Sequence, residues 1–346
     1  MQSVSRSIER SAATSSQGQP LEVERAAHGL RLRGTQLYLE PLGRPPLGFL
    51  AHARSASRTL PERTVATGPT VALLEASQPR ALLRSAALPA AYGKPFALGA
   101  VRLTLHPAGL VLGSAQLRCE AEGIDVLYAG DLGASRTAEP REQLACTTLV
   151  LRATYGHPRY LFPPREQALA QVAAFLERTL AEGRVPVLLA SPVGAAQELV
   201  AHLGPLGFTL RLHPAALRAC AVYRAQGVKL PEVEGLEGPS GPRDILVLPP
   251  RQRSERIVSA LGKPVRTCLL SGRALDGVPD GVDEALPLSD HLGQRDLIEY
   301  AVRSGARRVL TVHGFPEELA LALRERGIDA AAVREHGRQL ELPGFR

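Results

Sequence analysis

The sequence predicts an α/β protein with a β-rich first part, a middle in which β and α segments alternate, and a closing βαβα segment. Three observations support this. Short apolar segments broken by turn residues fill residues 21–164, apolar residues at helical spacing begin near residue 165, and single strands and helices then alternate. The 346 residues exceed what one core usually holds, roughly 250–300 residues, so more than one domain is expected.

The β-rich part contains segments such as LGFLAH and VRLTLHP, which fit short strands between glycine and proline turns. AQLRCEA and IDVLYAGD predict a hairpin that turns at Glu122–Gly123, and CTTLVLRATYG predicts a buried strand that leads into a loop. Residues 1–20 are polar and Ser-rich, which predicts a disordered tail.

The middle opens with a predicted helix, PPREQALAQVAAFLERTLAEG, with prolines at its start and Gly183 at its end. Strands such as VPVLLAS and DILVLPP alternate with helices after it, which predicts a parallel α/β unit. The closing segment repeats the order: strand VRTCLLSG, helix RDLIEYAVRSG, strand RRVLTVHG, helix PEELALALRERG and a last strand.

Composition narrows the function classes only slightly. The net charge of +7 favours anionic partners such as nucleic acid, but the charge is almost all arginine, which a GC-rich genome would also produce. The four cysteines are far apart, which argues against a thiolate zinc site and a disulfide framework. No apolar run approaches the ~20 residues of a membrane span, and no secretory signal precedes the domain, so a cytoplasmic protein is expected.

Three long motifs resemble one known family. LHPAGLVLGSAQLRCEAEGIDVLYAGDLG at 105–133 is similar to the LHPAGHxLGSAQ…GD stretch of metallo-β-lactamase nucleases. SDHLGQRDLIEYAVRSGARRVLTVHGFPEELALALRERGIDA at 289–330 resembles their closing SDHAD…G…THG segment. ATYGHPRYLFPP at 153–164 looks like the loop that introduces their β-CASP insertion. The bacterial ligase-associated DNA exonucleases, also described as messenger-RNA 3′-end-processing-like exonucleases, resemble the chain most.

The resemblance implies a four-layer αββα metallo-β-lactamase domain with an inserted α/β β-CASP domain. The first part of the metallo-β-lactamase domain would be 21–164, the insertion 165–265 and the closing part 266–346. Family members cut phosphodiester bonds with two zinc ions, and DNA or RNA would lie in the cleft between the two domains.

The family's zinc ligands come from HxHxDH, a later His, a bridging Asp and a distal His. Here the first motif is HARSAS at 52–57. His52 matches the first ligand, but Arg54, Ala56 and Ser57 stand where the other ligands should be. The His of the AGH motif is replaced by Leu110.

By the same resemblance, Asp131 matches the bridging carboxylate and His313 the distal His. Arg152 replaces an acidic residue before TYG, and Glu40 replaces the Asp expected before HxHxDH. The residual candidate ligands are therefore His52, Asp131 and His313, two per zinc where about three are needed. We expect no metal, or one weakly bound ion, because a guanidinium also repels cations.

His291, in SDH, is the candidate catalytic residue, since it matches a histidine that protonates the leaving group or holds the scissile phosphate. Arg54 and Arg152 are candidate contacts to substrate phosphate.

Structural explanations stay open for each of these residues. His52 would be held by packing. Asp131 would bond its loop or pair with Arg54 or Arg152. His313 would cap the following helix, and Asp290 would be the N-cap of the helix after SDH. Arg54 would form a buried salt bridge with Asp131 or Glu40.

Three functions follow. The favoured one is a catalytically impaired pseudonuclease that binds nucleic acid, an active paralogue, or a DNA-repair or RNA-processing partner. The alternative is an active metal-dependent exonuclease or phosphodiesterase with a reduced metal site. A third, an unrelated hydrolase, lacks a Ser–His–Asp signature. Whether the chain is an enzyme is left open by the sequence.

Overall fold

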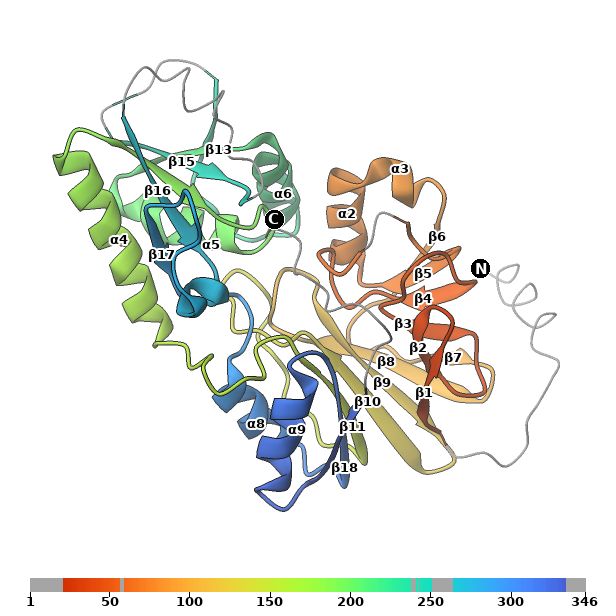
Figure 1. Ribbon diagram of the computed structural model, residues 1–346. Coiled ribbons are helices and arrows are strands. Elements are labelled where there is room, and N and C mark those ends of the chain that lie inside the picture. The colour runs from red at the N-terminus through yellow and green to blue at the C-terminus, as the bar shows by residue number, and fades with distance from the viewer. Residues whose placement is uncertain (1–20, 57–58, 238–240, 242, 251–263, 334–346) are drawn as a thin grey trace.

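The computed structural model describes residues 21–56, 59–237, 241, 243–250 and 264–333, and the tail expected at 1–20 lies outside them. The described chain forms three sheets with helices on their faces (Figure 1), which confirms the α/β class. No helix in the described ranges is long and apolar enough to cross a membrane.

The first sheet is built from short strands before residue 90. Its order follows the chain, antiparallel at first and parallel from β3 onward. The strands are β1 (Val23–Ala26), β2 (Gly29–Leu32), β3 (Leu37–Leu39), β4 (Leu47–Phe49), β5 (Arg63–Ala66) and β6 (Ala86–Pro89). Helices α2 (Gly68–Ser77) and α3 (Pro79–Leu82) connect β5 to β6.

The second sheet joins strands from the first part and the end of the chain, in the order β19-β18-β11-β10-β9-β8-β7. The predicted hairpin is confirmed, because β9 and β10 pair antiparallel across Glu122 and Gly123, both with positive φ. The strands are β7 (Phe96–Leu98), β8 (Val101–Pro107), β9 (Ala115–Ala121), β10 (Ile124–Gly130), β11 (Thr148–Ala153), β18 (Arg308–Gly314) and β19 (Asp329–Val333).

These two sheets share a buried apolar core. Leu32, Leu37 and Phe49 of the first sheet pack with Leu117 and Tyr128 of the second. The other face of the second sheet is covered by α8 (Gln294–Arg303) and α9 (Pro316–Arg324), whose apolar residues form a second cluster with that sheet. Burial of these apolar faces is the main driving force that holds the sheets and helices together.

The third sheet is entirely parallel, with the order β14-β13-β15-β12-β16-β17. Its strands are β12 (Val185–Leu189), β13 (Thr209–Leu212), β14 (Glu234–Gly235), β15 (Asp244–Leu248), β16 (Val265–Leu270) and β17 (Glu284–Leu286). Helices α4 (Arg165–Ala181), α5 (Ala195–Leu203) and α6 (Pro214–Ala225) pack on it, and two short 3₁₀ turns are η1 (Gly204–Leu206) and η2 (Gly272–Asp276).

The predicted helix after Pro163–Pro164 is confirmed, because α4 begins after Pro164 and Gly183 follows its end with a positive φ. The third sheet continues past residue 265, since β16 and β17 belong to it. The domain boundary expected at residue 265 stays a prediction.

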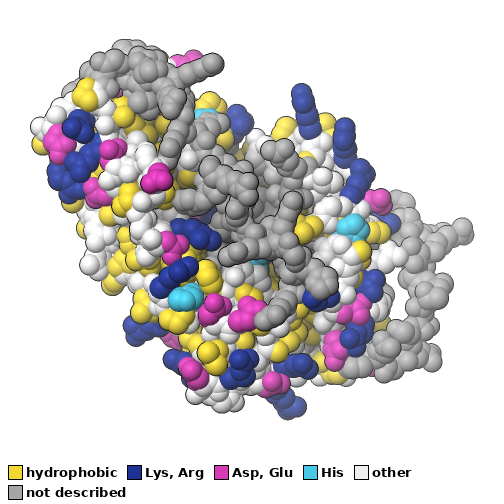
Figure 2. Space-filling view, in the orientation of Figure 1, with side chains coloured by type: hydrophobic (Ala, Val, Ile, Leu, Met, Phe, Trp, Pro, Cys, Tyr) yellow, Lys and Arg dark blue, Asp and Glu magenta, His cyan; other side chains and the backbone are white. Residues whose placement is uncertain are grey.

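Basic side chains do not form one stripe on the face drawn in Figure 2. Among the described residues visible there, Lys and Arg are interspersed with Asp and Glu. Net charge alone therefore does not locate a nucleic-acid surface. All four cysteines are buried and free in the structure.

Candidate functional site

A cavity of about 930 Å³ opens where the loops of all three sheets meet. Glu40 and His52 come from the first sheet's loops, Asp131 and Arg152 from the second sheet, and Asp290 from the segment after the third. Loops after β12, β15 and β16 form the opposite wall, so the carboxyl ends of parallel strands point at the cavity. Ligands in open α/β sheets commonly bind at such an edge.

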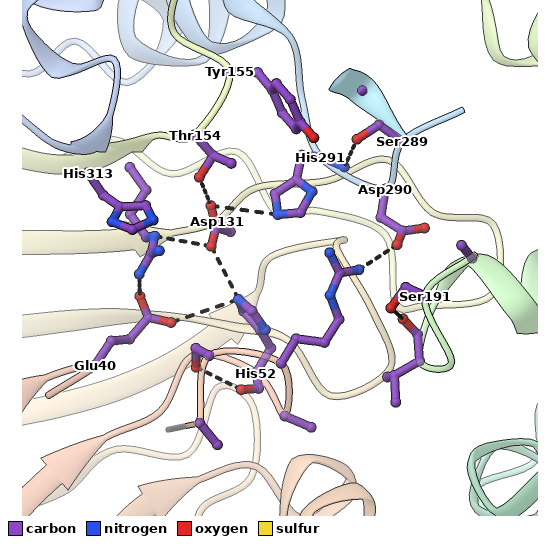
Figure 3. A pocket seen from close by; sticks show the side chains of 18 of the residues that line it. Glu40, His52, Asp131, Thr154, Tyr155, Ser191, Ser289, Asp290, His291 and His313 are labelled. Atoms are coloured by element: carbon purple, nitrogen blue, oxygen red, sulfur yellow. Dashed lines mark hydrogen bonds and ion pairs between the residues drawn. The ribbon is translucent and has the colours of Figure 1, made fainter. Parts of the chain in front are cut away.

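The structure brings three of the predicted site residues together (Figure 3). The Nε2 atom of His52 lies 3.4 Å from Oδ2 of Asp131, and Nε2 of His291 lies 3.8 Å from Oδ1. His313 lines the same cavity at the end of β18, on the Glu40 side, and its φ of 58° is in the left-handed region. The roles predicted for these residues, ligand or catalyst, stay predictions.

Arg152 stands between two buried carboxylates. Its Nη1 donates to Oε2 of Glu40 at 2.5 Å, and its Nε lies 3.1 Å from Oδ2 of Asp131. Only 2% of the Glu40 side chain and 6% of the Asp131 side chain are exposed. Of the two pairings considered for Asp131, the one with Arg152 is present.

Hydroxyl groups occupy other positions around these carboxylates. The Tyr128 hydroxyl donates to Oε2 of Glu40 at 2.5 Å, and the Thr154 hydroxyl donates to Oδ1 of Asp131 at 2.5 Å. Oε2 of Glu40 therefore accepts two hydrogen bonds, while Asp131 accepts one from Thr154 and forms an ion pair with Arg152. A carboxylate in such a setting is held in its ionised form.

Charge in the cluster is strongly stabilised. Burial alone would raise the pKa of Asp131, but the Arg152 guanidinium and the His52 hydrogen bond hold it well below its usual value. Burial likewise opposes the Glu40 charge, yet Arg152 and His52 lower the pKa of that carboxyl. Burial disfavours the charged form of Arg152, while Asp131 and Glu40 raise its pKa well above the usual range. All three groups are therefore ionised at neutral pH.

His291 is neutral in this setting. Burial and the nearby charge of Arg54 together lower its pKa to about 3, although the Asp131 carboxylate opposes this shift. Its ring packs edge-on against Tyr155 at 5.6 Å between centroids. A neutral imidazole in this position can donate or accept a hydrogen bond, but it brings no positive charge to a phosphate.

Arg54 has a different partner from those expected. Its Nη1 donates to Oδ2 of Asp290 at 2.5 Å, so the predicted salt bridge to Asp131 or Glu40 is wrong. Arg165 of α4 lies 3.7 Å from Oδ1 of Asp290 and also pairs with the buried Glu198 of α5. Gly194, with φ of 94°, lets the start of α5 approach, since a Cβ there would lie 2.7 Å from Oδ2 of Asp290.

Both predicted helix caps are wrong. The N-cap of α8 is Gly293, without a side-chain hydrogen bond, because Asp290 is engaged by Arg54 and the helix begins only at Gln294. The N-cap of α9 is Phe315 and not His313. The helices themselves begin at Gln294 and Pro316, within one residue of the predicted starts, so only the capping residues differ from the prediction.

Two of the replaced ligand positions, 56 and 110, carry apolar side chains. Leu110 is fully buried in a cluster with Leu50, Val111 and Tyr223, and Ala56 packs against it. Ser57 lies outside the described residues. A histidine at position 110 would have to enter an apolar interior.

The metal-binding arrangement of the family does not fit the described residues. Among them, no group of three or more His, Cys, Asp or Glu side chains is placed to hold a metal ion. Arg152 lies between Glu40 and Asp131, and hydroxyl donors face both carboxylates. We therefore derive no reaction step through a metal at this site.

Several contacts were not apparent from the sequence. Thr154 and Tyr128 were assigned to strands or loops without a role, and Arg25 also lines the cavity. Strand alternation would have placed Tyr128 facing the first sheet, but nothing local links Arg54 to Asp290, 236 positions away. Such pairs are visible only once the loops are assembled.

Two comparisons with known proteins were informative, one with family models and one with individual proteins. No family model matches the chain. It is 33% identical over 325 residues to a protein of Opitutus terrae named "Probable DNA ligase", covering 91% of this chain and 31% of that protein. It is 30% identical over 104 residues to the RNase J-like protein of Methanocaldococcus jannaschii, covering 29% of this chain and 25% of that protein.

A ribonuclease of Thermus thermophilus is 24% identical over 317 residues, covering 71% of this chain and 72% of that protein. The chain thus spans under a third of the ligase-named relative and a quarter of the RNase J-like protein. The chain belongs to the metallo-β-lactamase/β-CASP family.

Proposed function

We propose that this chain is a non-hydrolytic member of its nuclease family, which binds DNA in the cavity between the sheets without cutting it. The observation that carries the proposal is the guanidinium of Arg152 between Glu40 and Asp131. Two-metal hydrolysis requires ions that activate water and stabilise the transition state. A guanidinium keeps its protons and offers no open coordination position, so it supplies charge but no nucleophile.

The packing of the elements supports a four-layer αββα arrangement as part of the same proposal. The first two sheets share a core, and α8 and α9 cover the second sheet's outer face. On the first sheet's side, α2 packs with Leu50 and Ala66. The third sheet with α4, α5 and α6 would be the β-CASP insertion, extended to about Leu286.

Arg54 is the better candidate for a phosphate contact. Arg152 is committed to two carboxylates, and 16% of its side chain is exposed. Arg54 shares Asp290 with Arg165, and 24% of its side chain is exposed at the cavity. Arginine binds phosphate through paired N–H donors, and such contacts position a nucleic-acid backbone.

DNA is favoured over RNA by the Opitutus terrae relative, which is 33% identical and aligns with 91% of this chain. That relative is named a probable DNA ligase, and about two thirds of its length lies outside the match. A segment joined covalently to a DNA-joining protein would work on the same substrate. A cytoplasmic location would follow from that substrate, and a DNA ligase or an active paralogue would be the protein partner.

Metal content and cleavage, measured on one sample, test the proposal. Protein purified without chelators is analysed by elemental mass spectrometry and incubated with labelled single-stranded DNA and RNA. We expect well under one zinc or manganese per chain and intact substrates. The alternative, an active metal-dependent exonuclease or phosphodiesterase, is established instead by near-stoichiometric metal and cleavage that Asp131→Asn and His313→Asn abolish.

Binding is measured on the same protein by fluorescence anisotropy with a single-stranded DNA. We expect affinity that falls as salt rises, and a roughly 3–10-fold loss in Arg54→Gln, the value of one charge-assisted contact. The matched control is Arg303→Gln, which removes an exposed charge on α8. Equal losses in both variants would indicate non-specific attraction and contradict the proposed site.

A further inference from the structure

The Glu40–Arg152–Asp131 cluster is a buried group of three charges. Its carboxylates come from different sheets: Glu40 follows β3 and Asp131 follows β10. Arg152 reaches both from β11. Two carboxylates this deeply buried would repel each other, so the packing of the two sheets here depends on a cation between them.

The geometry is specific for a planar cation. Nη1 of Arg152 donates a hydrogen bond to Oε2 of Glu40 at 2.5 Å, while Nε lies 3.1 Å from Oδ2 of Asp131 in an ion pair without a hydrogen bond. A guanidinium presents donors in fixed directions in one plane and can serve two carboxylates at once. An ammonium concentrates its charge at a point and lacks this fork.

Neighbouring hydroxyl and imidazole groups also lie around the carboxylates of Glu40 and Asp131. Tyr128 and Thr154 donate hydroxyl hydrogens to these two carboxylates, and Nε2 of His52 lies 3.4 Å from Asp131 and 3.8 Å from Glu40. A metal ion requires several ligand lone pairs turned toward one point. Here Oε2 of Glu40 and both oxygens of Asp131 face N–H or O–H groups, while Oε1 of Glu40 is buried without a hydrogen bond. No three-ligand group is present among the described residues.

We infer that Glu40 and Asp131 form a guanidinium-binding site that the chain fills with its own Arg152, and that this internal cation, not a metal, stabilises the packing of the first two sheets. The inference goes beyond the proposed function, because it holds whether or not the cavity binds DNA. It also predicts a ligand class: once Arg152 is truncated, the vacated site accepts a small guanidinium in preference to a divalent cation.

Chemical rescue of Arg152→Ala tests this. Thermal unfolding is followed with and without methylguanidinium, with methylammonium as a cation of equal charge without the fork, and with zinc chloride. We expect Arg152→Ala to lower the melting temperature by about 10 °C, as for a broken buried pair. Millimolar methylguanidinium should recover roughly half of that shift, and methylammonium and zinc should recover little.

Two proteins serve as matched controls. The unaltered protein should gain nothing from methylguanidinium, zinc or a chelator, because its site is already filled. Arg118→Ala removes a guanidinium that pairs with Asp125 at 3.0 Å but is 30% exposed, so it should show a small loss and no rescue. Rescue in Arg118→Ala would reveal a general solvent effect and overturn the inference.

Other outcomes also decide the matter. Zinc that stabilises Arg152→Ala more than methylguanidinium does would show that the carboxylates remain a metal site. Absence of rescue by either cation, or an Arg152→Met variant as stable as the unaltered protein, would also overturn the inference.

A second variant applies if Arg152→Ala does not fold. The triple variant Glu40→Gln/Asp131→Asn/Arg152→Met should restore folding because it removes all three charges, and its failure would refute the inference. These readouts involve no nucleic acid, so they fail independently of the proposed function.

Discussion

Two arginines that stand where the family resemblance predicts other residues, Arg54 for a histidine ligand and Arg152 for an acidic residue, have different surroundings in the structure. Arg152 lies between carboxylates of the first and second sheets, which both belong to the same packed core. Arg54 reaches across the cavity to Asp290, which in turn faces Arg165 at the start of α4. One cluster therefore holds two sheets together, while the other joins the first sheet's loops to the third sheet and its helices.

The difference shows that two arginines lining one cavity can have different roles. Where the neighbouring carboxylates are buried and close, the guanidinium becomes a structural counter-ion. Where the neighbouring carboxylate is shared with another arginine at the cavity edge, the guanidinium remains near solvent and can meet a ligand. The two arginines therefore differ in the exposure of the guanidinium and in the number of carboxylates that it contacts, although the residue type is the same.

The largest effect is expected at the Arg152 cluster. Asp131→Ala leaves Arg152 with one carboxylate in a buried position and removes the acceptor of the Thr154 hydroxyl. We expect the free energy of unfolding to fall by about 3–5 kcal/mol, measured by urea denaturation. Asp329→Ala, at an exposed pair with Arg308, is the control and should change it by less than about 0.5 kcal/mol. A loss below about 1 kcal/mol in Asp131→Ala would remove the distinction between the clusters.

A smaller loss of unfolding free energy is expected for Glu198→Gln, at the contact between α4 and α5. Glu198→Gln keeps the shape of a buried side chain but weakens its pairing with Arg165, which still donates to the Ser289 carbonyl at 2.7 Å. The free energy of unfolding should fall by about 2 kcal/mol, the value of a hydrogen bond to a charged group. Glu177→Gln, in an exposed pair with Arg243, is the matched control and should be nearly neutral. A neutral result for Glu198→Gln would mean that Arg165 is held by its other contacts alone.

The smallest stability effect is expected for Arg54→Gln. Asp290 keeps Arg165 nearby, and the lost guanidinium is partly exposed, so the free energy of unfolding should fall by no more than about 1 kcal/mol. The same urea titration measures it. A cost equal to that of Asp131→Ala would show that Arg54 is also a structural counter-ion, and the comparison between the two arginines would break down.

Local patterns predicted local structure well. Prolines and a glycine marked the start and end of α4, and the Glu122–Gly123 turn gave the β9–β10 hairpin. The family resemblance named His52 and Asp131 as candidate ligands without establishing that they meet, and in the structure the two lie 3.4 Å apart.

The charge pairing was predicted less well. Asp290 looked like a helix cap because it shortly precedes a helical pattern, yet its carboxylate bonds Arg54 from a distant loop. Which carboxylate an arginine meets depends on how loops from separate sheets approach each other. That information is spread over the whole fold and leaves no local periodicity to detect.

The place of β18 in the second sheet has a consequence for how the chain is made. β11 pairs with β10 on one edge and with β18 on the other, and the whole third sheet lies between β11 and β18 in the chain. During synthesis, β11 emerges long before its second neighbour exists. The backbone N–H and C=O groups on that edge of β11, which carries the apolar side chains of Leu149, Val150 and Leu151, therefore stay unpaired until β18 is synthesised. Completion of the sheet is a late, non-local event, and a newborn chain stalled before β18 would be prone to aggregation and a substrate for chaperones.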